Sequence, residues 1–203
     1  VAMYTVTPNV KRAYELAEYY KKQGAYVVLG GVHTTVCPDE SINHADTILI
    51  GEVEYTWPVF LKDFQRNETK KIYSQPLGEV DINHSPVPSF HLLPENARKL
   101  IPIQTARGCP HGCKFCNLRS LYGKPYRTKK IENIEKEIEA VKQINPRAVI
   151  YFTDDNLFCN RTHAEALLQK VSEYNLTWYA NTDISFGSDT KFIKIAYKCG
   201  LIL

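Results

Sequence analysis

Short apolar runs alternate with longer amphipathic segments along most of the chain, and this alternation constrains the fold more than any other feature. In the second half, strands are expected at residues 148–152 and 177–180, between helical patterns at 131–143, 162–174 and 189–198. Repeated strand–helix units predict parallel strands with helices packed outside them, as in an open sheet or a partial barrel. We therefore expect an α/β fold.

The first 65 residues follow the same order. Thr7 and Pro8 have the residue types of a helix start, and Gly24 ends the helical pattern that follows. Strands are expected at 26–29 and 47–50, and a helix at 54–64. Both strands end at glycine, which is typical of the turns of parallel α/β sheets.

The hydrophobic periodicity weakens between these two halves, where four prolines interrupt it. We expect a first domain at 1–65, a linker at 66–100 and a second domain at 101–203. The chain opens in an apparent strand and stops at the start of another apolar run, residues 201–203. We therefore expect a fragment of a longer protein.

The composition of the chain argues against several classes of function. Basic and acidic residues, 25 and 22 in number, are interspersed, so no basic stripe argues for nucleic acid. No run approaches the roughly 18–20 apolar residues that span a bilayer, and the N-terminus lacks the order of a signal peptide. We expect no transmembrane segment and a cytoplasmic protein, in which the six cysteines are thiols or metal ligands rather than disulfides.

Three cysteines, Cys109, Cys113 and Cys116, lie in one short loop after an expected strand at 101–105. Gly108, just before the first cysteine, and Gly112, between the first two, allow the tight backbone that lets the thiolates converge. Full cysteine ligation of a four-iron cluster uses four thiolates, so three leave one iron open to another ligand. The alternative is a structural zinc site completed by His111, although zinc sites usually pair two separated cysteine knuckles and no second knuckle is present.

The other cysteines, Cys37, Cys159 and Cys199, are isolated in the sequence and are expected to behave as small apolar residues.

The segment Arg107–Cys116, with aromatic Phe115 before the last cysteine, resembles the signature of radical S-adenosylmethionine (SAM) enzymes, and the chain as a whole resembles their cobalamin-binding branch, the group that includes the hopanoid methylases. Further family-like stretches lie at residues 28–33, 50–54, 88–93, 121–124 and 152–158.

The resemblance implies that residues 1–65 are the C-terminal part of a Rossmann-like cobalamin-binding domain and that 101–203 are the N-terminal half of a radical SAM (β/α) barrel. It places Gly30, Gly31, Gly51 and Glu52 beside cobalamin, although the two glycines after the first strand could equally be a strand-ending turn. The Asp-x-His-x-x-Gly segment that supplies a cobalt ligand in some cobalamin domains is absent, and His33 does not replace it.

The resemblance also implies a [4Fe–4S] cluster on the three cysteines and SAM on the barrel. Asp154 or Asp155, of which Asp155 is favoured, is expected to accept from the SAM ammonium, and the alternative for each is an acidic helix cap. Phe115 is expected near the adenine. Contacts with the carboxylate and ribose of SAM are expected from residues at the end of the third strand, namely Asn181 and Ser185 with their neighbours Thr182 and Asp183. A polar loop of any α/β protein would have a similar composition.

These features predict a radical SAM enzyme that methylates an unactivated carbon with the help of cobalamin. The alternatives are a cyclase or rearrangement enzyme of the same branch, or a noncatalytic module in which the cysteines hold a structural metal. The resemblance implies a small-molecule substrate, either a lipid, a natural-product intermediate or a tetrapyrrole, and a reducing partner such as flavodoxin or ferredoxin. No catalytic acid or base can be nominated.

Overall fold

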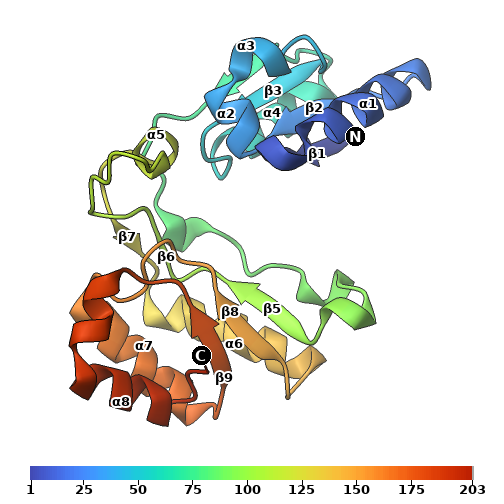
Figure 1. The fold of residues 1–203 in the computed structure, drawn as a ribbon. Helices are drawn as coiled ribbons and strands as arrows, with labels where there is room; N and C mark the ends of the chain where they lie inside the picture. The colour runs from blue at the N-terminus through green and yellow to red at the C-terminus, as the bar shows by residue number, and fades with distance from the viewer. Residues whose placement is uncertain (203) are drawn as a thin grey trace. The chain divides into compact units, whose positions relative to one another are not determined.

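The computed structural model describes residues 1–202, which form two compact units (Figure 1). Unit 1 contains Val1–Val80 and Cys113–Gly123, and unit 2 contains Asp81–Gly112 and the chain from Lys124 onward. The first unit therefore runs to Val80 rather than to residue 65, and it takes a second segment from beyond the expected linker.

The sheet of unit 1 consists of four parallel strands in the order β1-β2-β3-β4. Their bounds are Ala2–Tyr4, Val28–Gly30, Thr47–Ile50 and Ile72–Ser74. Strand β4 lies in the segment expected to be a linker. It has only three residues, of which Tyr73 alone is buried, so it carries too little periodicity to be detected in the sequence.

Apolar residues cover both faces of this sheet. One face packs Leu29 and Ile48 against Tyr14 and Ala17 of α1 (Val10–Lys22), which follows a 3-10 turn. The other packs Leu49 against Phe60 of α4 (Thr56–Gln65). Three short helices complete the unit: α2 (Val32–Val36), α3 (Pro38–Ser41) and α5 (Leu118–Tyr122).

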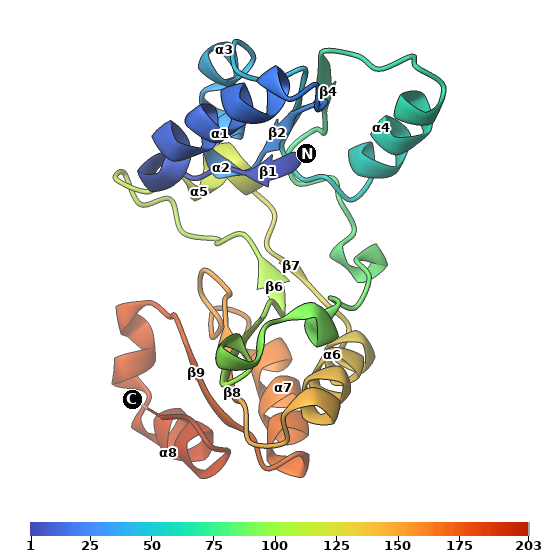
Figure 2. The ribbon, with the colours of Figure 1, turned by 90° about the vertical axis from the view of Figure 1, so that its right-hand side faces the viewer.

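Unit 2 is built on a parallel sheet in the order β5-β8-β9. The strands are Leu100–Ile103, Val149–Phe152 and Thr177–Ala180, and the helices between and after them are α6 (Ile131–Ile144), α7 (Arg161–Glu173) and α8 (Thr190–Lys198). Figure 2 shows the helices of this unit beside its strands. A separate ribbon pairs β6 (Ala106–Arg107) with β7 (Arg127–Thr128) in antiparallel register.

One face of the β5-β8-β9 sheet forms the core of unit 2. Ile103, Phe152 and Trp178 are buried there against residues of the three helices. Tyr151 and Tyr179 lie on the other face and stack with ring centroids 4.7 Å apart. Because adjacent residues of a strand point to opposite faces, the sheet has one face covered by helices and one face lined by polar aromatic rings.

The long elements agree closely with the sequence predictions. The structure places β3 and β9 at the expected residues, and α1, α6, α7 and α8 begin and end within about two residues of the expected positions. The short elements α2, α3, α5, β4, β6 and β7 were not predicted. Among residues 1–202, no helix combines the length and the apolar character that crossing a membrane requires.

Candidate functional site

The carboxyl ends of β5, β8 and β9 bring three polar segments to one edge of the unit 2 sheet. Parallel strands end at a common edge, so the residues that follow them are neighbours in space although far apart in sequence. These segments are 104–108, 153–157 and 181–185. The first leads directly into the cysteine loop.

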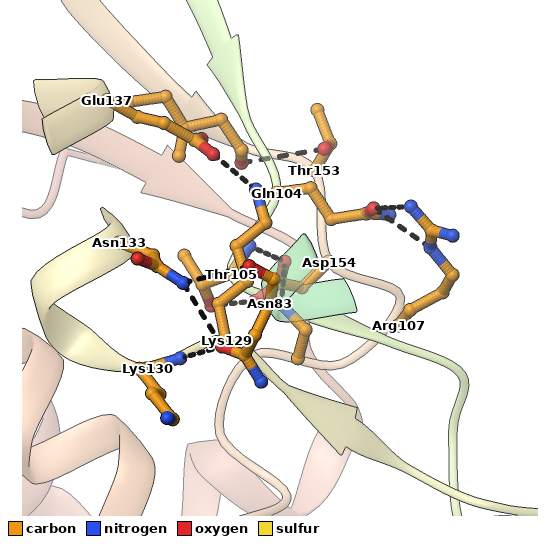
Figure 3. Close-up of polar contacts among 12 residues, drawn as sticks. Asn83, Gln104, Thr105, Arg107, Lys129, Lys130, Asn133, Glu137, Thr153 and Asp154 are labelled. Carbon is orange, nitrogen blue, oxygen red and sulfur yellow. Dashed lines mark hydrogen bonds and ion pairs between the residues drawn. The ribbon is translucent and has the colours of Figure 1, made fainter. Parts of the chain in front are cut away.

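Asp154 fastens the segment after β5 to the end of β8 (Figure 3). Its Oδ1 accepts from the backbone N–H groups of Thr105, at 2.6 Å, and Ala106, at 2.9 Å, and its Oδ2 accepts from the Thr105 hydroxyl. Asp154 is fully buried, so its carboxylate is turned inward onto the backbone and not toward a ligand. The structure thus gives this residue a positioning role in place of the expected contact with SAM.

Burial raises the pKa of Asp154 to about 6, although the three donors act in the opposite direction. His163 of α7 lies behind the same hydroxyl, with its Nε2 3.3 Å from Thr105 Oγ1, and burial lowers its pKa. His163 is therefore a second buried titratable group beside Thr105.

Asp155 is the more accessible of the two aspartates. Its Oδ2 accepts from the Gly108 N–H at 3.2 Å, immediately before Cys109. Burial raises its pKa, and the nearby Arg107 cation opposes this effect. Asp155 therefore contacts the start of the cysteine loop and remains partly exposed.

Asn156 and Asp183 join the ends of β8 and β9. The buried Asn156 amide donates to Asp183 Oδ2 at 2.5 Å, and its oxygen accepts from the Thr182 hydroxyl at 3.2 Å. Asp183 Oδ2 also lies 3.0 Å from His111 Nε2 in the cysteine loop. Hydrogen bonds from Ser185 and Asn156 hold the pKa of Asp183 well below its usual range.

Asn181 and Ser185, the other residues expected at this strand end, are exposed. Asn181 donates to the Tyr151 hydroxyl at 2.7 Å, and the Ser185 N–H donates to Asp183 Oδ1 at 2.7 Å. Asp183 thus caps the 3-10 turn that carries Ser185 and also contacts His111. His111, the fourth ligand of the alternative zinc site, is thus paired with Asp183 through one of its two ring nitrogens.

All three cysteines of the loop are free thiols. Cys109 is partly buried in unit 2, whereas Cys113 and Cys116 are exposed in the segment grouped with unit 1. Phe115 between them is 93% exposed. The division between the units crosses the loop, so the convergence of the three thiols remains a prediction.

The donor set fits a [4Fe–4S] cluster with one open iron. Three unpaired thiols within one short loop are what such a cluster requires, and Gly108, at φ 89°, supplies a backbone turn that other residues rarely adopt. The Gly108 N–H and His111 are each held by a carboxylate of unit 2. The first half of the loop is therefore fixed from the sheet edge.

Two residues beside Cys109 were missed by the sequence analysis. Burial raises the pKa of Tyr126 far above its usual range, and its hydroxyl shares a hydrogen bond with Cys159. Burial also raises the pKa of the Cys159 thiol, to which the charge of Cys109 adds. Cys159 is therefore not isolated in the fold, but its distance in sequence from the loop hid this proximity.

A buried ion pair lies next to the segment that follows β5. Lys129 Nζ lies 2.5 Å from Glu137 Oε1 (Figure 3), and both side chains are almost fully buried. The Lys129 N–H donates to the Thr105 carbonyl at 2.8 Å. Thr105 is thus held both by Asp154 and by the residue that carries this ion pair.

In unit 1, the expected cobalamin residues lie at the carboxyl ends of β2 and β3. Gly31 has φ 105°, and a Cβ there would meet the Thr5 carbonyl oxygen at 2.7 Å. Gly51 has φ 82°, and a Cβ there would meet the Gln75 carbonyl oxygen at 2.8 Å. Both glycines are therefore required by the protein backbone itself, whereas Gly30 has room for a Cβ and Glu52 is buried.

Known proteins with similar sequences identify the family of this chain. Residues 103–194 match the radical SAM superfamily, and the chain belongs to that superfamily. Several of its relatives are methyltransferases in name. The bacteriochlorophyllide d C-12(1)-methyltransferase of Chlorobaculum tepidum is 32% identical over 98% of this chain and 45% of its own length. The hopanoid C-2 methylase of Rhodopseudomonas palustris is 32% identical over 73% of this chain and 28% of its own length.

Among solved structures, the cobalamin-dependent SAM radical enzyme OxsB, determined with aqua-cobalamin and SAM bound, superimposes with a TM-score of 0.73. The likeness covers 98% of this chain and 33% of OxsB at 18% identity, so it shows a shared fold. The chain spans less than half the length of the relatives it matches.

Proposed function

We propose that the protein carrying this chain is a cobalamin-dependent radical SAM methyltransferase that acts on an unactivated carbon. The observation that carries the proposal is the attachment of a three-cysteine loop to the carboxyl edge of a parallel sheet through Asp155 and Asp183. Relatives named as methyltransferases favour methylation over cyclisation or rearrangement.

Cys109, Cys113 and Cys116 are the residues that would hold the cluster. When bound and reduced, a [4Fe–4S] cluster with an open iron supplies the electron that cleaves SAM. Asp154 serves this chemistry indirectly, because it fixes the backbone of Thr105 and Ala106 from which the loop departs. Removing that carboxylate would loosen the base of the loop.

SAM would be held by the polar residues of the sheet edge. Asp155 is only partly buried, so its carboxylate is more accessible to an ammonium than that of the fully buried Asp154. Asn181 and Ser185 are exposed at the next strand end, where they are available to carboxylate or ribose oxygens. Phe115, at 93% exposure, has a ring available to stack on the adenine.

Cobalamin would lie against the carboxyl edge of the unit 1 sheet, where Gly30, Gly31, Gly51 and Glu52 are found. Ligands of open α/β sheets bind outside the carboxyl ends of the strands. Bound cobalamin would supply the methyl group. Gly30 has space for a Cβ 3.6 Å from the Leu49 side chain, so at this position the approach of a ligand, more than crowding by the protein, accounts for a glycine.

A small molecule is the proposed substrate, and a tetrapyrrole is favoured. The relative named for bacteriochlorophyllide matches nearly the whole chain, whereas the one named for hopanoids matches 73% of it. We propose flavodoxin or ferredoxin as the reducing partner and a cytoplasmic location.

The test uses the full-length protein, reconstituted anaerobically with iron, sulfide and cobalamin. Reduction in the presence of methyl-labelled SAM and a chlorophyllide should release 5′-deoxyadenosine and label the tetrapyrrole. Cys109→Ala should abolish both products. Cys199→Ser, which changes a cysteine at the edge of the unit 2 core, should retain both. A protein that binds zinc in place of iron and leaves SAM intact would refute the proposal.

A further inference from the structure

Unit 1 contains a cluster of three metal-ligating side chains that is unrelated to the cysteine loop. His33, Cys37 and Glu40 each offer one ligand atom, and these atoms all lie within 4.8 Å of one another. His33 Nε2 and Glu40 Oε1 are 3.6 Å apart. We propose that this cluster is a zinc site.

The local backbone explains how the three residues meet. The Cys37 N–H donates to the His33 carbonyl at 2.8 Å, so these residues are one helical turn apart on the same face of α2. Pro38 then starts α3, and this second short helix carries Glu40. The spacing His-x3-Cys-x2-Glu is present in the sequence, but its meaning depends on the turn between the two helices.

His33 is prepared for a metal by its surroundings. The residue is 5% exposed, and its Nε2 is buried without a hydrogen-bond partner. Its other ring nitrogen, Nδ1, lies 3.1 Å from Thr7 Oγ1. Metal-binding histidines commonly donate their second N–H to an oxygen in this way, which leaves the lone pair of the first nitrogen directed at the metal.

The unpartnered nitrogen distinguishes this cluster from a simple ion pair. A buried polar atom without a partner costs roughly 1–3 kcal/mol, and the 3.6 Å separation from Glu40 is too long for a hydrogen bond. A metal ion between the two atoms would satisfy both.

Distances and charge suit zinc. Zinc bonds of about 2.0–2.3 Å in tetrahedral geometry place ligand atoms roughly 3.3–3.8 Å apart, so the nitrogen and the carboxylate oxygen already have a suitable separation. The third ligand needs to move by about 1 Å at most. A thiolate and a carboxylate together neutralise the ion, and three protein ligands leave one position for water.

Tyr14 of α1 borders the cluster. The Tyr14 hydroxyl lies 3.1 Å from Ser41 Oγ, and its pKa is raised mainly by burial and in part by Glu40 beside it. The Tyr14 ring also packs edge-on against the His33 ring, with centroids 6.3 Å apart. Tyr14 of α1 therefore lies beside both His33 and Glu40.

The test requires a chain in which zinc has no competing thiol cluster. Cys109, Cys113 and Cys116 are therefore changed to alanine in the full chain, and Zn²⁺ is titrated anaerobically against a chromophoric chelator. One zinc ion should bind, with release of the thiol proton of Cys37, and Co²⁺ in its place should give a thiolate charge-transfer band. Far-UV circular dichroism checks that each variant is folded.

Variants of the chain that lacks the three loop cysteines distinguish binding at His33, Cys37 and Glu40 from nonspecific zinc binding. Cys37→Ser should weaken zinc binding by about 100-fold or more and abolish the cobalt band, and Glu40→Gln, at an exposed position, should weaken it by at least about tenfold. Thr7→Val, which removes only the partner of Nδ1, should cost about 10–100-fold.

Cys199→Ser, the matched control, should leave the zinc affinity unchanged. Absence of zinc binding, a loss below tenfold in Cys37→Ser, or an equal loss in Cys199→Ser would overturn the proposal. None of these results depends on the cluster or on cleavage of SAM.

Discussion

The role assigned to Asp154 can be tested by Asp154→Ala in the isolated chain. The substitution leaves two buried N–H groups, those of Thr105 and Ala106, without an acceptor. Each costs roughly 1–3 kcal/mol, so the free energy of unfolding of unit 2 should fall by about 2–6 kcal/mol. Asp154→Asn should cost clearly less, because its remaining oxygen still accepts from both N–H groups.

The same residue gives a pH dependence with a definite sign. Its pKa is raised from 3.8 to about 6 in the folded chain, so its favourable contribution is complete below pH 3.8 and is lost as the pH rises through 6. The shift corresponds to about 3 kcal/mol. The difference in stability between wild type and Asp154→Asn should therefore move against the wild type by this amount over that window.

Urea unfolding in the Trp57→Phe background measures both effects. Trp178, which is fully buried in unit 2, then remains as the only tryptophan and reports on the unit that contains Asp154. Equal stabilities of the alanine and asparagine variants, or a difference from wild type that does not change between pH 4 and pH 7, would refute the assigned role.

Three further predictions concern other contacts. Gly31→Ala should destabilise unit 1 by roughly 1–3 kcal/mol in urea unfolding, because its Cβ would clash with Thr5, whereas Gly30→Ala should be near neutral. Lys129→Met should cost about 3–5 kcal/mol because Glu137 stays buried without its cation; a second change, Glu137→Leu, that fails to recover most of this loss would contradict the assignment. Hydrogen bonds lower the pKa of Asp183, so wild type should lose more stability than Asp183→Asn as the pH falls below 3.8, and parallel acid titrations of the two would count against the network.

Most helices and strands could be predicted from the sequence because the long elements have a regular hydrophobic periodicity of their own. The helix at 131–144 buries Ile134, Ile138 and Val141 at helical spacing, and such a stripe is visible without any knowledge of tertiary contacts. Strand β4 and the ribbon β6–β7 have two or three residues each. Their existence depends on pairing with distant strands, which local patterns do not encode.

The sequence predicts the cysteine loop and the strand-end residues of the candidate site, but not the contacts that hold them. The spacing of the three cysteines identifies the loop, and strand ends identify Asp155 and Asn181. Sequence alone could not distinguish Asp154, which faces the backbone of Thr105, from its neighbour, because the orientation of a side chain after a strand is set by the loop it meets. Likewise, the proximity of Glu40 to His33 depends on the turn between two short helices, α2 and α3, that the sequence did not predict.

The central claim is that Cys109, Cys113 and Cys116 hold a four-iron cluster with one iron open to SAM. Electron paramagnetic resonance of the anaerobically reconstituted and reduced full-length protein tests it most directly. We expect a reduced [4Fe–4S] signal that changes on addition of SAM and that is absent when any of the three cysteines is changed to alanine. A cluster signal that survives these substitutions, or one that SAM leaves unaltered, would contradict the claim.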